Sequence, residues 1–425
     1  MITSAYEEIR HESVRLVEDR NIDTASDLES TRKAVSDTVE AYQRRAHLGR
    51  ARALSDPTDM VDRVVRAIVG FGPLTDLLER QDIEEVFIEG TRVSFLDGEG
   101  RLAALRAPVG EVEARHVVER LLAETDRRLD AASPVVQARV LGGSARLTAV
   151  IPPVAEGLSA SIRRYALRTE NLESLVKLGS MTPAAAGFLR AAMQTDASVL
   201  ISGPPGSGKT SLLAALLAAA PPTHCIRCCE EVRELHVPIV HGSYYEARPP
   251  GVDGSGEISL RALVKLVLAM RPDRIVIGEV RGSEAFELTR AANAGCGFAC
   301  TIHANSAREA LTAVVNAALM AGENVPEPFV RRVLVSAVDV VVHLERDSIV
   351  RGLDGLRRQV TEILAMVPSL HDDFSVEPLF LRERLGGPLT WTGALPPAGL
   401  ADRIARSLPS GIDLRDVMSG RAEPL

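Results

Sequence analysis

The sequence predicts an α/β fold for most of the chain, preceded by a small α+β domain and a helical N-terminal region. From about residue 172, short apolar stretches of strand length recur, and helical patterns separate most of them. Between residues 58 and 165, paired strand patterns surround one amphipathic helix. Before residue 58 the sequence is charged, and its apolar residues recur only at helical spacing.

These patterns divide the 425 residues into five segments, because the chain is too long for one ordinary core. Asp56-Pro57 marks the first break. The segments are a helical region at 1–57, the α+β domain at 58–165, a linker at 166–171, the α/β domain at 172–367 and a tail at 368–425. We expect the tail to be loop-rich, because it contains Gly386-Gly387-Pro388 and Pro396-Pro397.

Periodicity and turn residues place the individual elements. In the α+β domain the expected helices are 58–69 and 112–129, and the expected strands are 86–90, 93–98, 138–141, 145–150 and 159–164. In the α/β domain the expected buried strands are 199–202, 225–229, 239–242, 275–278, 299–302 and 338–344.

Composition narrows the class of protein. The formal net charge of −8 argues against a general nucleic-acid-binding surface, so we expect no direct nucleic-acid partner. The first residues lack the basic and apolar parts of a signal peptide, and no run of about 18 apolar residues occurs. The five cysteines form an odd number, which favours reduced thiols. Together these features predict a cytoplasmic protein.

One stretch between a predicted strand and a predicted helix fits G-x-x-x-x-G-K-[ST], the P-loop pattern. Its residues are Gly203, Pro204, Pro205, Gly206, Ser207, Gly208, Lys209, Thr210 and Ser211. Glycines allow backbone N–H groups to surround a phosphate, and the helix that follows points its positive end at the same anion. Lys209 can reach the β- and γ-phosphates, and the Thr210 hydroxyl is a ligand for Mg²⁺. The sequence therefore predicts a nucleoside triphosphate site.

Acidic and histidine side chains follow three other apolar strands. Glu279 ends Ile275-Val276-Ile277-Gly278, where a carboxylate can orient the attacking water, or it simply begins a surface loop. Glu230 and Glu231 follow another strand and suit a water-mediated Mg²⁺ contact, although acids commonly follow strands. His303 follows a third strand, where it contacts the γ-phosphate or has a purely structural role.

These motifs, in this order, resemble the secretion ATPases of type II and type IV systems, over about residues 60–365. The resemblance rests on the P-loop, on Glu230-Glu231 with Glu234-Leu235, and on Thr301-x-His303-Ala304-Asn305-Ser306. Arg271-Pro272-Asp273-Arg274 and Gly278-Glu279-Val280-Arg281-Gly282 are similar to the tight-adherence (Tad/Flp) pilus assembly branch, the CpaF or TadA type. Phe71-Gly72-Pro73-Leu74, Ser133-Pro134 and Ala149-Val150-Ile151-Pro152-Pro153 resemble its N-terminal signatures.

The resemblance implies a RecA-like ATPase domain in a homo-hexameric ring. Such a motor would act on inner-membrane platform proteins at the cytoplasmic face of the membrane, powering pilus assembly or protein secretion. It implies catalytic roles for Glu279, Lys209, His303 and Glu230, and Mg²⁺ ligation by Thr210, Glu230, Glu231 and Glu279. Arg163, Arg164, Arg248 and Arg261 match arginines that approach the nucleotide, although each is equally compatible with a solvated or interface salt bridge.

Two departures leave other functions open. Ala269 stands where many relatives carry an arginine, and Ala294-Gly295-Cys296 stands where many carry Thr-Gly-His. A nucleotide-binding regulatory scaffold with weak or no turnover is one alternative, and a RecA-like motor acting on nucleic acid is another. Cys225, Cys228, Cys296, Cys300 and His303 also raise the question of zinc. Cysteines three apart on one strand point to opposite faces, which argues against a zinc site.

Overall fold

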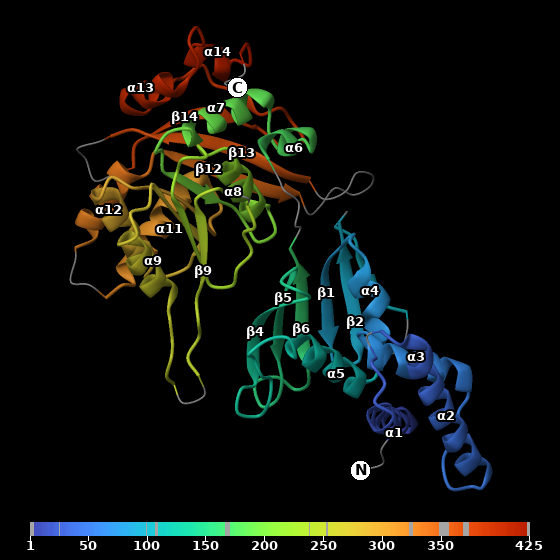
Figure 1. The fold of residues 1–425 in the computed structure, drawn as a ribbon. Coiled ribbons are helices and arrows are strands. Elements are labelled where there is room, and N and C mark those ends of the chain that lie inside the picture. The colour runs from blue at the N-terminus through green and yellow to red at the C-terminus, as the bar shows by residue number, and fades with distance from the viewer. Residues whose placement is uncertain are drawn as a thin grey trace. The chain divides into compact units, whose positions relative to one another are not determined.

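The computed structural model describes residues 4–24, 26–98, 100–106, 109–165, 171–237, 239–251, 254–322, 326–347, 357–368 and 374–422. The chain divides into two compact units, residues 1–166 and 167–425 (Figure 1). Each unit has its own hydrophobic core, and the two are described separately below.

The first unit begins with three helices, α1 (Ala5–Asp19), α2 (Leu28–His47) and α3 (Pro57–Val69). Ser4, Asp27 and Asp56 precede them, and each side chain accepts a hydrogen bond from a backbone N–H of the first helical turn. The helices pack together through a buried apolar cluster, which comprises Tyr6, Ile9, Val35, Val39, Tyr42, Val64, Val65 and Ile68.

A six-stranded antiparallel sheet follows, in the order β3-β2-β1-β6-β5-β4. The strands are β1 (Ile83–Glu89), β2 (Arg92–Asp97), β3 (Leu102–Ala104), β4 (Val135–Val140), β5 (Ala145–Val150) and β6 (Ser159–Arg164). The short helices η1 (Gly72–Leu74) and α4 (Thr75–Glu79) precede β1, and α5 (Glu111–Leu122) lies between β3 and β4. Apolar side chains of β1, β4, β5 and β6 alternate inward and pack against α5, which gives this sheet one covered face.

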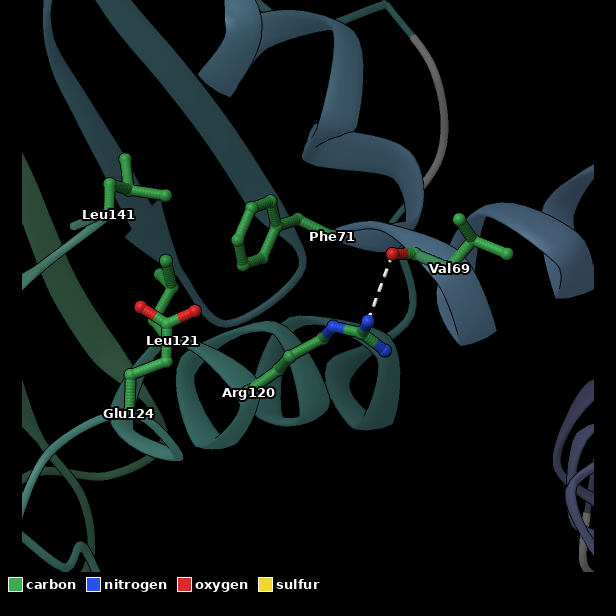
Figure 2. Close-up of a pocket in the computed structure, with 6 residues that line it drawn as sticks. All are labelled: Val69, Phe71, Arg120, Leu121, Glu124 and Leu141. Atoms are coloured by element: carbon green, nitrogen blue, oxygen red, sulfur yellow. Dashed lines mark hydrogen bonds between the residues drawn. The ribbon is translucent and has the colours of Figure 1, made fainter. Parts of the chain in front are cut away.

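Helix α5 ends at Leu122, earlier than the expected end at residue 129. Leu129 is nevertheless buried in the same core, so the apolar pattern continued past the end of the helix. Arg120 donates hydrogen bonds to the carbonyls of Ile68 and Val69 and so satisfies the open end of α3 (Figure 2). Figure 2 shows the small cavity beside this contact, which is lined by Val69, Phe71, Arg120, Leu121, Glu124 and Leu141.

The second unit is built on a nine-stranded sheet in the order β15-β14-β13-β12-β7-β11-β10-β8-β9. The strands are β7 (Val199–Ser202), β8 (Ile226–Glu230), β9 (Gly242–Glu246), β10 (Arg274–Val280), β11 (Gly297–Ile302), β12 (Val340–Asp347), β13 (Arg357–Met366), β14 (Val376–Leu381) and β15 (Thr390–Trp391). Strands β7 to β12 run parallel to one another, and β13, β14 and β15 extend the sheet in antiparallel pairs.

Helices cover both faces of this sheet. One apolar cluster holds α6 (Leu172–Lys177), α7 (Pro183–Met193), α8 (Lys209–Ala218), α13 (Ala398–Ser407) and α14 (Leu414–Met418). The other holds α9 (Leu260–Leu268), α10 (Ala285–Asn293), α11 (Ala307–Leu319) and α12 (Glu327–Ala337). Strand β7 contributes Val199 and Ile201 to the first cluster and Leu200 to the second. This two-sided burial explains why its sequence is continuously apolar.

Two expectations about this unit were wrong. The strand expected at 239–242 begins only at Gly242, because the tight turn that closes from Ile239 to Gly242 precedes β9. The tail is not loop-rich, since β14, β15, α13 and α14 all lie within it. Strand β14 pairs with β13, a strand that the sequence analysis did not single out, and α13 and α14 pack on α7.

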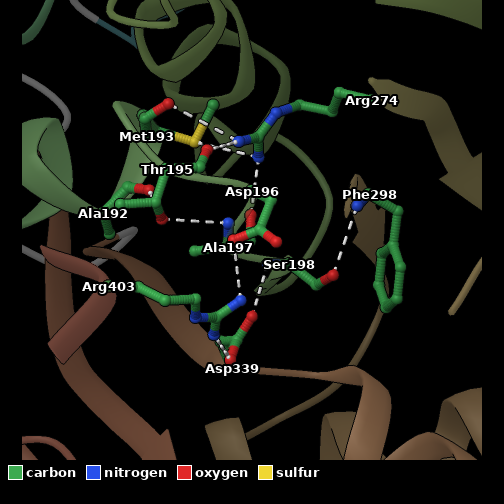
Figure 3. Close-up of polar contacts among 10 residues, drawn as sticks. All are labelled: Ala192, Met193, Thr195, Asp196, Ala197, Ser198, Arg274, Phe298, Asp339 and Arg403. Atoms are coloured by element: carbon green, nitrogen blue, oxygen red, sulfur yellow. Dashed lines mark hydrogen bonds and ion pairs between the residues drawn. The ribbon is translucent and has the colours of Figure 1, made fainter. Parts of the chain in front are cut away.

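Ion pairs tie the tail to the amino-terminal edge of the sheet (Figure 3). Arg403 on α13 pairs with Asp196, at 2.8 Å between Nη1 and Oδ1, and also with Asp339. Asp339 in turn accepts the backbone N–H of Ser198 at 2.8 Å. Beside them Arg274 is fully buried, and it donates to the carbonyls of Thr195 and Ala197 at 2.6 Å each. The tail is therefore part of the α/β unit.

Candidate nucleotide-hydrolysis site

The predicted P-loop lies between β7 and α8, at the carboxyl-terminal end of β7. Gly203 has φ +153°, and a Cβ there would stand 2.3 Å from the carbonyl oxygen of Leu344. Only glycine fits such an approach, which brings the loop against the neighbouring strand. Lys209 begins α8, followed by Thr210 and Ser211 in its first turn.

Inside the loop, polar donors turn toward the loop's own oxygens. Lys209 is buried, and its Nζ lies 3.0 Å from the carbonyl oxygen of Gly203 and 3.1 Å from that of Pro204. The backbone N–H of Ser207 also points to Pro204, at 3.3 Å. The Ser207 hydroxyl is buried with no hydrogen-bond partner among the described residues. A phosphate fits this cradle, because it would supply acceptors to all three donors.

His303 connects the P-loop to Glu279. Its Nδ1 lies 3.2 Å from Nζ of Lys209, and its Nε2 contacts Oε1 of Glu279. An ammonium can only donate, so Nδ1 is the acceptor and the imidazole proton resides on Nε2, facing the carboxylate. Burial lowers the pKa of His303, the Lys209 charge lowers it further, and Glu279 opposes both. The neutral form of the imidazole is therefore favoured.

Glu279 is also held from its other side. Nε of Arg281 lies 2.6 Å from Oε2 of Glu279. The side chain of Glu279 is 23% exposed and that of His303 43% exposed, so this group stands open to solvent. Sequence reasoning did not assign Arg281 a role, although it is only two residues from Glu279. The structure thus joins Lys209, His303, Glu279 and Arg281 in one continuous chain of polar contacts.

The two predicted acids after β8 have different surroundings. Glu230 is buried, and its carboxylate accepts backbone N–H groups of Glu234 at 3.1 Å and Leu235 at 3.3 Å. Burial raises its pKa to about 7. Glu230 lies so close to Gly278 that a Cβ there would meet it at 2.7 Å. Glu231 is exposed at its surface, but neighbouring atoms still remove part of its contact with water. This partial desolvation, followed by the charge of Glu284, raises its pKa. Glu230 supports the loop beside Glu279, whereas Glu231 faces solvent.

The four predicted arginines are divided between the two units, with Arg248 and Arg261 in the second. Arg261 pairs with buried Glu287 at 2.8 Å and donates to the carbonyl of Ala321, so its charge serves the packing of α9 on α10. Arg248 is exposed, and its backbone bridges to Ile258.

Arg163 and Arg164 end β6 in the other unit. Partial burial lowers the pKa of Arg164. Arg163 pairs in register with Arg146, and Arg146 with Arg139, across β6, β5 and β4. This row of three basic residues follows from strand register, which sequence reasoning did not use.

The cysteines line strands and their ends rather than a turn. Cys228, Cys229, Cys296 and Cys300 are buried, and burial raises the pKa of each thiol. Their protonated forms are therefore favoured, and a zinc ligand must be the thiolate. The described residues contain no group of three or more His, Cys, Asp or Glu side chains arranged to hold a metal ion.

Residues 68–362 match the family described as type II/IV secretion system proteins. The chain belongs to this family. The type II/IV secretion match spans the sheet of the first unit and the P-loop, Glu279 and His303 of the second. Within the described part of the chain, no helix is long and apolar enough to cross a membrane.

Relatives of the type II/IV secretion family carry several names. The chain is 36% identical over 307 residues to a Mycobacterium tuberculosis protein named for conjugal transfer, covering 70% of this chain and 85% of that protein. It is 32% identical to the type IV secretion system protein PtlH homolog of Bordetella bronchiseptica, covering 67% of this chain and 91% of that one. The crystal structure of the pilus retraction motor PilT with ADP matches at 19% identity and a TM-score of 0.51, covering 68% of this chain and 82% of PilT. That likeness concerns the fold.

Proposed function

We propose that this protein is an ATP-hydrolysing motor that works as a hexamer and powers pilus assembly or protein secretion at the cytoplasmic face of the membrane. The observation that carries the proposal is the chain of contacts from Lys209 through His303 to Glu279. It links a phosphate-binding loop to a carboxylate at the adjacent end of the sheet, which is the arrangement that phosphoryl transfer to water requires. Membership of the secretion family and the names of its relatives support the motor role.

In the proposed reaction, Lys209 and the loop N–H groups bind the β- and γ-phosphates. Glu279 orients the attacking water once it is released from Arg281. His303, held neutral with its proton on Nε2, bridges the γ-phosphate end and Glu279. Mg²⁺ would supply charge neutralisation, and the hard oxygens of Thr210, Glu279 and the solvent-facing Glu231 suit that ion. Buried Glu230 acts through the loop that it holds.

The Tad/Flp branch, the hexamer and the inner-membrane platform partners are part of this proposal. The sequence motifs at Arg271–Arg274 and Gly278–Gly282 support the Tad/Flp branch. We propose that nucleotide and a neighbouring copy complete the environment of Arg163, Arg164 and Arg248. Arg261 is assigned a structural role by its ion pair with Glu287.

The test is ATP turnover as a function of protein concentration, for wild type, Glu279→Gln and a matched control, Glu383→Gln. Glu383 is an exposed glutamate after β14. We expect turnover per chain to rise as oligomers form, to fall by at least about 100-fold in Glu279→Gln, and to be unchanged in the control. A wild-type hexamer that hydrolyses ATP no faster than Glu279→Gln would contradict the motor function.

One structural observation favours a second candidate, a nucleotide-binding regulatory scaffold. Glu279 is held by Arg281 and His303 at once, and Ala269 directly follows α9 where the family resemblance led us to expect an arginine. In a scaffold, nucleotide would bind without releasing Glu279. Nucleotide binding with no turnover in a confirmed hexamer would support this function, and restoring Ala269→Arg would then be the first variant to measure.

A further inference from the structure

Two arginines that no motif indicates lie beside the P-loop. The ladder between β12 and β13 places Arg346 directly opposite Arg358, and β12 is also the neighbour of β7. Nη1 of Arg346 lies 2.7 Å from where a Cβ of Gly206 would stand. Nε of Arg358 donates to the carbonyl oxygen of Gly206 at 3.0 Å. Both guanidinium groups therefore lie against Gly206 of the loop.

Like charges directly opposite each other on neighbouring strands destabilise a sheet. Arg346 is exposed, and no ion pair with the described residues offsets its charge. A bound anion would offset it, since guanidinium groups bind phosphate through charge-assisted hydrogen bonds. The cost of the pair in the absence of ligand indicates a site for a negatively charged ligand at this place.

Arg358 acts on the loop itself. In a trans peptide the C=O and the following N–H lie in one plane and point in opposite directions. By holding the carbonyl of Gly206 outward, Arg358 directs the N–H of Ser207 toward the interior of the loop, where it now meets Pro204. That N–H is one of the donors that a phosphate would use. Arg358 is thus a positioning residue.

The order of strands around the P-loop indicates which end of the nucleotide's phosphate chain faces which side of the loop. Strand β11, which His303 follows, and β10, which carries Glu279, lie on one side of β7, and β12 with Arg346 lies on the other. The reacting γ-phosphate belongs beside His303 and Glu279. We propose that Arg346 binds the opposite end of the phosphate chain, the α-phosphate next to the ribose, and that Arg358 fixes the loop for it. This inference rests on the proposed nucleotide function.

A contact with the α-phosphate is made equally in ATP and ADP, so it contributes uniform binding and not catalysis. The test compares wild type with Arg346→Gln by calorimetric titration with Mg-ADP and a non-hydrolysable Mg-ATP analogue. We expect both affinities to weaken about tenfold, with kcat at saturating ATP unchanged within about twofold. Arg332→Gln, an exposed arginine on α12, is the control for lost charge and should bind as wild type does.

Three outcomes would overturn the inference. Unchanged affinity for both nucleotides would remove Arg346 from the site. Weaker binding of the ATP analogue alone would place Arg346 at the γ-phosphate instead. If wild type itself bound no nucleotide, the proposed function would be overturned as well. This outcome is distinguishable from the other two because the wild-type titration alone shows it.

Arg358 has its own readout. We expect Arg358→Gln to weaken both nucleotides and to lower kcat, because a displaced loop N–H affects ground state and transition state alike. Arg358→Lys keeps one donor for the Gly206 carbonyl and should restore part of both losses. A merely structural role would lower the thermal midpoint in both variants without this partial rescue. Unchanged affinity and kcat in Arg358→Gln would contradict the positioning role.

Discussion

The parallel strands of the nine-stranded sheet begin along one edge, the amino-terminal edge, and end along another, the carboxyl-terminal edge. These two edges use charged residues in opposite ways. At the amino-terminal edge, Arg274 is fully buried and Asp339 is mostly buried, and their hydrogen bonds lie entirely within the protein. At the carboxyl-terminal edge, His303, Glu279 and Arg281 are partly exposed and hold one another. The first edge spends its charges on fixing the fold. The second keeps them in contacts that a ligand can replace, and it is there that we expect the proposed chemistry.

The largest expected effect concerns the amino-terminal edge, where the charged groups are buried (the buried edge). Arg274→Ala removes the donors of the Thr195 and Ala197 carbonyls and leaves a cavity, so we expect the free energy of unfolding to fall by about 4 kcal/mol. Urea denaturation measures it. Arg274→Met, which fills the volume without donating, should recover part of the loss. A loss below about 1 kcal/mol in Arg274→Ala would show that this edge is not a structural anchor.

The next effect concerns the carboxyl-terminal edge, where the charged groups are partly exposed (the open edge). Lys209→Ala removes the cation that faces the Gly203 and Pro204 carbonyls, and we expect at least about 100-fold lower ATP turnover with little change in stability. Lys177→Ala, at an exposed lysine of α6, is the control and should match wild type in both. If Lys209→Ala lost stability as Arg274→Ala does, the two edges would not differ as described.

A pH dependence tests Glu230, which borders the open edge but is buried. Its pKa is raised from 4.5 to about 7 in the folded protein. Between these values the folded state binds the proton more tightly than the unfolded state, so its stability falls as the pH rises. We expect wild type to lose about 2 kcal/mol more than Glu230→Gln does between pH 5 and pH 8 in urea denaturation. Parallel curves for the two proteins would show that Glu230 titrates normally.

The smallest effect concerns the tail. Arg403→Ala leaves Asp339 without its cation, and burial already raises the pKa of that carboxyl. We expect about 1–2 kcal/mol lower stability, because one partner of a mostly buried pair remains uncompensated. Arg406→Ala, at an exposed arginine of the same helix, should stay within about 0.5 kcal/mol of wild type. Equal losses of stability in the two variants would show that the ion pair between Arg403 and Asp339 does not stabilise the buried edge.

The sequence predicted the elements that local patterns determine. β7 and β5 begin and end where their apolar patterns do, and the P-loop, Glu279 and His303 meet at one edge because parallel strands end there. It did not predict β13, β14 or the tail helices. Pro378 interrupts the apolar pattern of β14, and long-range contacts order these elements, through strand pairing of β13 with β12 and β14 and through packing of α13 and α14 on α7. Arg346 and Arg358 were missed because strand register and the approach of the P-loop, not local sequence, bring them to the site. Arg281 was missed although it is only two residues from Glu279.

The tail also places the protein's only tryptophan. Trp391 lies on β15, donates its indole N–H to the carbonyl of Ala394 at 2.7 Å, and packs against the core on the α7 and α8 side of the sheet. Indole emission shifts to longer wavelength when the ring becomes hydrated. Intrinsic fluorescence excited at the red edge of the absorption band therefore reports on a single point of this 425-residue chain. It gives a label-free optical signal for whether the tail stays docked while the P-loop goes through its cycle.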